Sequence, residues 1–270
     1  MGRAAAREAV MKGDLFKGIM QWEFGMPKSK LKKKEFRLPV FYYDNSSLTA
    51  IFTASTKKVL PFLPDPRMHP AEVMPGRCLV AFTAFEYRKT DIDPYNEFSI
   101  AVIVSYGKRP IPGLTVLSQM RRKCYDAYVW HLPVTTEIAR YGGVELYGYP
   151  KILAKIDITR GRDAAECVLS EKKTHILTLR GPVLHTKPGG IIRYRTYPVR
   201  EGVTLCGNVY SLHHQFAETR STKGVSLTLG TDHEICRQLR SVGLSEKALM
   251  YQYSPLNESI LFGPHNLIDD

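Results

Sequence analysis

Short runs of β-branched and aromatic residues recur along most of this 270-residue chain, separated by glycine, proline and charged turn residues. Such runs predict strands, and strands at this short spacing with few helical patterns are typical of a closed barrel or paired sheets. The predicted strands are 36–43, 78–87, 98–106, 125–132, 152–158, 165–169, 175–179, 191–197, 203–216, 225–229 and 249–253. We therefore expect a mainly β (α+β) protein with a few peripheral helices.

Four segments predict helices instead. Their apolar residues recur at helical spacing, and capping or breaking residues stand at their ends. These segments are 4–20, 45–60 (capped by Asn45 and ended by prolines), 135–140 (stopped by Gly142 and Gly143) and 232–243 (capped by Asp232).

The formal net charge is +12, and about half of it lies at one end of the chain. Residues 1–37 hold ten basic side chains against four acidic ones. We therefore divide the chain into a basic N-terminal helix and linker (1–36) and a single domain (37–270). The basic stretch 27–34 lacks the interleaved aromatic residues that stack on bases, so nucleic acid is not an expected partner.

Several classes of protein are disfavoured by what the chain lacks. No apolar run is long enough for a membrane span, and the basic N-terminus has no continuous apolar signal region. Five cysteines without a Cys-x-x-Cys pair indicate neither a zinc site nor a full disulfide framework, so we expect a cytoplasmic location. Neither a metal-binding spacing nor a phosphate-binding loop is present, and we expect no cofactor.

One lysine stands in an unusual setting, in the stretch Gly-Val-Glu-Leu-Tyr-Gly-Tyr-Pro-Lys-Ile-Leu at 143–153. Gly148 permits a tight turn and Pro150 stiffens the corner, so Lys151 is expected to enter the following strand in a fixed position. Apolar surroundings would lower the pKa of Lys151, and a neutral amine is a nucleophile for carbonyl compounds. At the reference pKa of about 10.4, only about one amine in 2,500 is neutral at pH 7.

This stretch resembles the active-site segment of the acetoacetate decarboxylase family, in which the lysine of Tyr-Pro-Lys forms a Schiff base with a β-keto acid. Two further stretches are similar in the same order: Val-Leu-Pro-Phe-Leu-Pro at 59–64, and Val-Ala-Phe at 80–82 followed by Tyr-Asn-Glu at 95–97. The resemblance covers roughly residues 37–160. It implies a conical antiparallel barrel with the lysine inside, a small keto-acid substrate and a homo-oligomer.

The resemblance also implies roles for individual residues. Lys151 matches the Schiff-base lysine, and Glu97 matches the active-site glutamate, which would orient the substrate, move protons or balance the iminium charge. Tyr149 precedes the lysine and is expected to contact substrate, as is Glu145, which matches a glutamate near the pocket. Arg37 is the nearest candidate for the arginine that holds the substrate carboxylate.

Two departures from the family pattern bear on the reaction. The family has a second lysine directly after the nucleophile, where this chain has Ile152, and it often has a further acid where this chain has Thr83. We therefore expect a carboxy-lyase acting on acetoacetate or a related keto acid, with an aldolase or dehydratase using the same lysine as the alternative. A non-catalytic basic binding protein is the second alternative.

Overall fold

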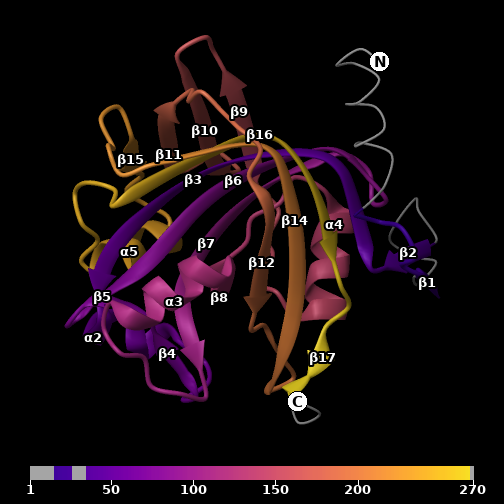
Figure 1. Ribbon diagram of the computed structural model, residues 1–270, viewed down its shortest axis with the longest axis horizontal. Coiled ribbons are helices and arrows are strands. Elements are labelled where there is room, and N and C mark those ends of the chain that lie inside the picture. Colours follow the sequence, from indigo (N-terminus) through magenta and orange to yellow (C-terminus); the bar gives the residue numbers. More distant parts are fainter. Residues whose placement is uncertain (1–14, 26–34, 268–270) are drawn as a thin grey trace.

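The computed structural model describes residues 15–25 and 35–267. Seven strands form a closed ring in the order β7-β8-β12-β14-β16-β3-β6, and the pairing of β6 with β7 completes it. They are β3 (Val40–Ser55), β6 (Arg77–Thr90), β7 (Tyr95–Tyr106), β8 (Cys124–His131), β12 (Gly190–Thr196), β14 (Val203–Thr219) and β16 (Met250–Leu261). The expected closed barrel is confirmed (Figure 1). Neighbouring strands are antiparallel except β8 and β12, which run parallel.

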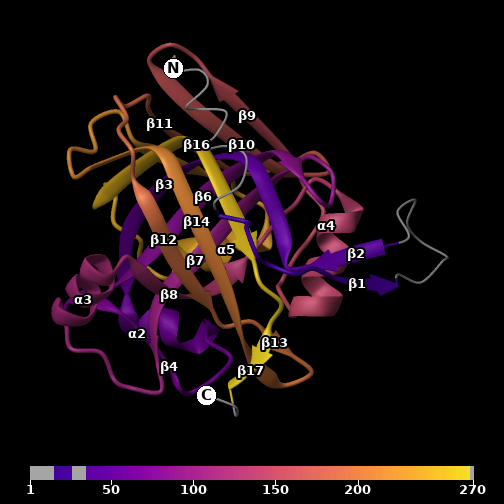
Figure 2. The ribbon, with the colours of Figure 1, turned by 45° about the vertical axis from the view of Figure 1, so that its right-hand side comes forward.

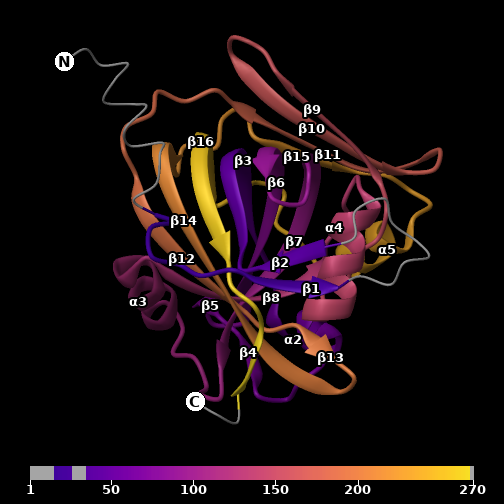
Figure 3. The same ribbon diagram turned by 90° about the vertical axis from the view of Figure 1, so that its right-hand side faces the viewer.

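A second sheet lies across one side of the barrel, at the top in Figures 1 and 3. Its strands pair in the order β15-β11-β10-β9. They are β9 (Lys155–Arg160), β10 (Ala164–Glu171), β11 (Thr174–Pro182) and β15 (Ser226–Leu229). The first three form the antiparallel meander that the sequence predicts.

The remaining elements are short. Small strands extend the edges of the barrel or pair with each other: β1 (Trp22–Gly25), β2 (Glu35–Leu38), β4 (Met68–Pro70), β5 (Glu72–Met74), β13 (Val199–Arg200) and β17 (His265–Asn266). The helical segments are α2 (Thr56–Val59), η1 (Leu60–Phe62), α3 (Leu114–Arg122), α4 (Glu137–Tyr141), η2 (Gly142–Tyr147) and α5 (Glu234–Ser241). Figures 2 and 3 show α3 and α4 on opposite sides of the barrel. None of the helices in the described ranges has the length and hydropathy of a transmembrane segment.

The hydrophobic core lies outside the barrel wall rather than inside it. On β3 the residues Leu48, Ala50, Phe52 and Ala54 are at most 2% exposed, and they belong to one cluster with residues of the second sheet and α5. Because successive side chains of a strand point to opposite faces, the residues between them face the barrel interior. The same alternation holds along β6 and β7, so burial of their outer faces leaves the interior open for a ligand.

The helix expected over 45–60 is wrong, because Val40–Ser55 is one long strand. Leu48, Ile51 and Phe52 match helical spacing by coincidence, whereas burial alternates with period two along the strand. β3 pairs with β6 from Tyr42 to Ser55, and this ladder outweighs the local pattern. Only the four residues of α2 and the turn η1 remain helical.

Two other predicted helices are placed differently. Helix α5 begins after His233, whose side chain accepts a hydrogen bond from the Ile235 amide, so Asp232 is not the cap. Of the expected N-terminal helix, residues 4–14 lie outside the described residues and 15–18 form a turn. The basic linker 27–34 also lies outside the described residues.

The predicted domain boundary between residues 36 and 37 stays a prediction. Phe36 and Leu38, on either side of it, are both buried in one cluster beside α4 and η2.

Candidate active site

The corner before Lys151 is made by a helix that continues past the point where the sequence predicts its end. Gly142 and Gly143 do not stop α4, because the chain continues through the wider π-helical turn η2 to Tyr147. Gly148 ends it in the left-handed region, with φ of 77°, where a side chain would be strained. The Tyr149 amide then donates to the Gly143 carbonyl at 2.9 Å, which folds the chain back on η2.

Gly143 also makes the space that the lysine occupies. A Cβ at this position would lie 2.3 Å from Cδ and 2.4 Å from Cε of Lys151. The aliphatic part of the lysine therefore passes directly over the glycine. Lys151 can pack in this position only because residue 143 has no side chain, whatever role Gly143 also has in forming the turn.

Lys151 and Glu97 form a buried ion pair. Lys151 Nζ donates to Glu97 Oε2 at 2.8 Å, and the two residues are only 9% and 7% exposed. Backbone pairing holds their two segments together. Val134 forms one β-bridge with Glu97 and another with Leu153, which lies two residues after Lys151. This three-segment arrangement brings together residues that lie 54 positions apart in the chain.

Tyrosines surround this pair. Tyr87 donates a hydrogen bond to Glu97 Oε1 at 3.2 Å, and the Lys151 ammonium lies 5.7 Å from the centre of the Tyr95 ring. The hydroxyls of Tyr42 and Tyr95 are 3.2 Å apart. Burial, and then the charge of Glu97, raise the pKa of Tyr42, Tyr87 and Tyr95, so these phenols stay neutral hydrogen-bond donors near pH 7.

Tyr149 closes the same end of the barrel from another side. Its hydroxyl lies 2.6 Å from Oγ1 of Thr196, which also contacts the Gly207 carbonyl. Burial raises the pKa of Tyr149 as well. A Cβ at Gly207 would lie 2.7 Å from the Tyr149 hydroxyl, so this close contact requires glycine on β14.

The pair opens into a cavity of about 380 Å³ inside the barrel. The cavity extends from Lys151, Glu97 and Tyr149 to helix α3, which contributes Val116, Gln119 and Met120. Between these ends it is lined by inward-facing residues of all seven barrel strands. Among the lining residues the cationic side chains are Lys151 and Arg220, and Arg220 is exposed at the end of β14.

Three of the five sequence-predicted site residues therefore meet in one place: Lys151, Glu97 and Tyr149. The structure does not bring Arg37 or Glu145 to them. Arg37 is exposed on β2 and Glu145 is exposed on η2, and neither lines the cavity. Their roles in substrate binding stay predictions, because sequence register does not determine on which side of a strand or helix a residue lies.

Tyr87 and Gly143 were not among the residues predicted from the sequence. Tyr87 lies on the same face of β6 as Thr83, four residues away, and this period-two relation was the available signal. Gly143 was noted only as a helix stop, because its contact with Lys151 depends on how the corner folds back. In the described ranges, no three histidine, cysteine or acidic side chains group closely enough to hold a metal ion.

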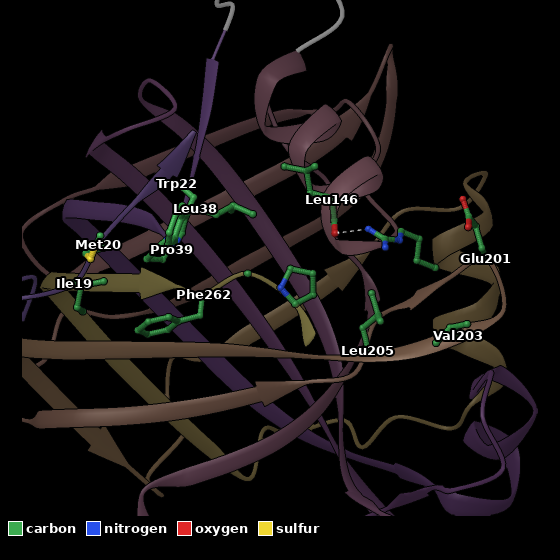
Figure 4. Close-up of a pocket in the computed structure, with 13 residues that line it drawn as sticks. Ile19, Met20, Trp22, Leu38, Pro39, Leu146, Glu201, Val203, Leu205 and Phe262 are labelled. Carbon is green, nitrogen blue, oxygen red and sulfur yellow. Dashed lines mark hydrogen bonds between the residues drawn. The ribbon is translucent and has the colours of Figure 1, made fainter. Parts of the chain in front are cut away.

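A second, larger hollow of about 810 Å³ lies on the outside of the barrel (Figure 4). Its lining is largely apolar, and Arg200 donates there to the Leu146 carbonyl at 2.9 Å. Neither Lys151 nor Glu97 reaches it. The interior cavity, with its enclosed amine and carboxylate, is therefore the stronger candidate for chemistry.

The barrel cavity has the groups needed for reaction with a carbonyl compound. The amine is a nucleophile once it loses a proton, and the carboxylate at 2.8 Å is placed to accept that proton. Neutral tyrosine hydroxyls beside both groups can donate hydrogen bonds to oxygen atoms of a ligand.

Comparisons with known proteins agree with this fold. A family model described as acetoacetate decarboxylase matches residues 25–246. A solved structure from studies of acetoacetate decarboxylase is 16% identical, with a TM-score of 0.59, and the alignment covers 85% of this chain and 89% of that one. Acetoacetate decarboxylase from Legionella pneumophila is 14% identical, with a TM-score of 0.60 and coverage of 85% and 87%.

The enduracididine biosynthesis enzyme MppR, in complex with pyruvate, is 12% identical to this chain. Its TM-score is 0.60, and the alignment covers 92% of this chain and 98% of that one. At these identities the structural likenesses show a shared fold. No curated protein matches the chain significantly.

Proposed function

Because this chain belongs to the acetoacetate decarboxylase family, we propose that it is an enzyme in which Lys151 forms a Schiff base with a keto acid, and that it decarboxylates β-keto acids. The observation that carries the proposal is the pairing of Lys151 Nζ with Glu97 Oε2 at 2.8 Å inside an enclosed cavity. Lysines are almost never buried unless they are paired, and a largely apolar cavity with a few convergent polar groups is where ligand sites are expected.

The first half of the proposed reaction forms the iminium. Glu97 accepts a proton from the Lys151 ammonium, and the neutral amine adds to the ketone carbon to give a carbinolamine. Glu97 then returns this proton to the carbinolamine hydroxyl, which leaves as water, and the product is a protonated imine beside the restored carboxylate. Glu97, with its second oxygen held by Tyr87, keeps a negative charge beside the new cation.

The second half breaks the carbon–carbon bond. The carboxylate leaves as carbon dioxide, and its bonding electrons move into the iminium to give an enamine. Protonation of the enamine carbon and attack by water release the ketone and restore the amine. Apart from Lys151, the cavity end near Glu97 has no cationic side chain among the described lining residues, so a substrate carboxylate loses hydration there. Its conversion to neutral carbon dioxide is favoured by the same surroundings.

Aldol or dehydration chemistry through the same lysine is the second candidate. Ile152 stands where the family has its second lysine, and Thr83 where it often has an acid. The structural relative MppR was also solved with the condensation product of pyruvate and imidazole 4-carboxaldehyde. These observations support other reactions of a Schiff base on this fold, and the assay has to distinguish them.

The test is borohydride trapping followed by mapping of the modified residue. With acetoacetate, the proposal expects a reduced adduct on Lys151 and release of acetone. An adduct that forms only with pyruvate and an aldehyde would favour the second candidate, and absence of any adduct would refute both. Lys151→Met should abolish the adduct, whereas Lys155→Met, which changes an exposed lysine four residues away, should not.

Neither Arg37 nor Glu145 has a role in this proposal, because neither reaches the cavity. Assembly as a homo-oligomer and a cytoplasmic location belong to the same proposal. Light scattering of the purified protein and microscopy of a tagged chain would test them.

A further inference from the structure

The interior faces of three adjacent strands form regular levels above the ion pair. The pairing of β7 with β6 and of β6 with β3 places Glu97, Phe85 and Ser47 side by side, and these residues form the first level. The second level contains Ser99, Thr83 and Thr49, and all three line the cavity. We refer to Ser99, Thr83 and Thr49 as the hydroxyl level.

The hydroxyl level retains hydrogen-bonding capacity toward the cavity. Oγ1 of Thr49 and Oγ1 of Thr83 are 3.0 Å apart, and this bond uses only one of their two hydroxyl protons. The Ser99 hydroxyl makes no hydrogen bond to the described part of the chain. Thr49, Thr83 and Ser99 are all partly exposed, whereas their outward-facing neighbours on the same strands are buried.

Beyond this level the inward faces of β3, β6 and β7 become apolar. The third level is Ala101, Ala81 and Ile51, and the residues that follow toward α3 include Leu79, Ile103 and Met120. The polar level therefore lies between the reactive pair and an apolar outer section. Across the cavity, β14 and β16 contribute further polar side chains, among them Ser211, His213 and Gln252.

The depth of the hydroxyl level defines which part of a substrate would reach it. Inward-facing residues two positions apart on a strand are separated by about 7 Å. A carbonyl carbon bonded to Lys151 would thus place atoms a few bonds further along its tail at this level. A volume of about 380 Å³ corresponds to roughly a dozen waters, which exceeds the need of a four-carbon acid.

Building on the proposed function, we propose that Thr49, Thr83 and Ser99 form a specificity subsite for keto acids whose tail carries a neutral oxygen function, a hydroxyl or a carbonyl, close to the ketone and ends in an apolar group. The hydroxyls can donate to and accept from such a group, and the apolar outer section takes the tail end. A second carboxylate at this level would meet hydroxyls rather than a cation to offset its lost hydration, since the cationic lining residue other than Lys151, Arg220, is exposed at the end of β14.

The experiment compares two substrates of equal length, 3-oxooctanoate and 5-hydroxy-3-oxooctanoate. The wild-type protein should show a kcat/KM about tenfold higher for the hydroxylated acid, as expected for one or two hydrogen bonds that the plain acid cannot make. Thr83→Val keeps the shape of the side chain but removes its hydroxyl, so the ratio should fall to near one. Thr83→Ser restores a hydroxyl and should recover most of the preference.

Because each comparison is a ratio within one variant, general damage to folding cancels. A wild-type ratio of one, or a ratio that is unchanged in Thr83→Val, would overturn the subsite. If borohydride traps no adduct with either acid, the proposed function fails. The subsite is then judged by calorimetry, from the ratio of the Kd values of the two acids in the wild type and in Thr83→Val. The control variant is Thr159→Val, which changes an exposed threonine of β9. Its kcat/KM ratio for the two acids should equal that of the wild type.

Discussion

Adding a single methyl group at Gly143 should disable the site without removing any reactive group. In Gly143→Ala the new Cβ would lie 2.3 Å from Lys151 Cδ, whereas carbon atoms in contact prefer about 3.5–4.0 Å. The lysine side chain would have to move by more than about 1 Å, away from its 2.8 Å contact with Glu97. A misplacement of this size costs on the order of 100-fold in rate, and we expect that loss in kcat/KM.

Gly142→Ala is a matched control on the same helical turn. Its Cβ would lie 2.3 Å from Phe36 Cε2, so the collision is equally severe but affects a core ring instead of the lysine. Both variants are overpacked and should lose about 1–3 kcal/mol of unfolding free energy. Only Gly143→Ala should also lose the alignment of the amine.

The assay combines kcat/KM, the rate of borohydride trapping at Lys151, and thermal unfolding. We expect Gly142→Ala to keep activity within a few-fold of the wild type below its unfolding transition. The packing argument would be wrong if Gly143→Ala retained full activity, or if Gly142→Ala lost as much as Gly143→Ala.

Three further perturbations test other parts of the site. Glu97→Gln keeps the size of the side chain but cannot accept the ammonium proton, so trapping should slow by about 100- to 10,000-fold, and an unchanged rate would rule out proton transfer to Glu97. Thr196→Val leaves the buried Tyr149 hydroxyl without its 2.6 Å partner and should lower the free energy of unfolding by about 1–3 kcal/mol in urea titrations, whereas no change would mean that water replaces the contact. Burial lowers the pKa of His213 to about 4, while the unfolded value is about 6.5, so the unfolded chain binds the proton first as pH falls. Stability should therefore drop between about pH 6.5 and 4, by about 3 kcal/mol from this group, and His213→Gln should remove that contribution from the profile.

Local patterns were sufficient for much of the fold. Strands such as 98–106 and 125–132 are predicted because their β-branched and aromatic residues favour extended backbone whatever their partners are. The segment 45–60 shows the limit of this reasoning. Its apolar residues satisfy both helical and strand spacing, and only pairing with β6 and burial against the second sheet select the strand.

The reactive lysine could also be recognised locally, because glycine and proline constrain the corner around Lys151 through their own backbone preferences. Its partner Glu97 was identified by resemblance to the family. Neither type of reasoning showed that Tyr87 contacts Glu97, that Gly143 makes room for the lysine, or that Arg37 and Glu145 do not line the cavity.

The sequence by itself determined which segments are extended and where one lysine stands in a stiffened corner, since these follow from the preferences of neighbouring residues. The tertiary structure alone decided which face of each strand lines the cavity and which residues meet at each depth. Thr49, Thr83 and Ser99 lie on three different strands, and they form one level only because the register of the closed barrel aligns them. That register is set by long-range pairing and by burial of the outer faces, which no short stretch of sequence contains.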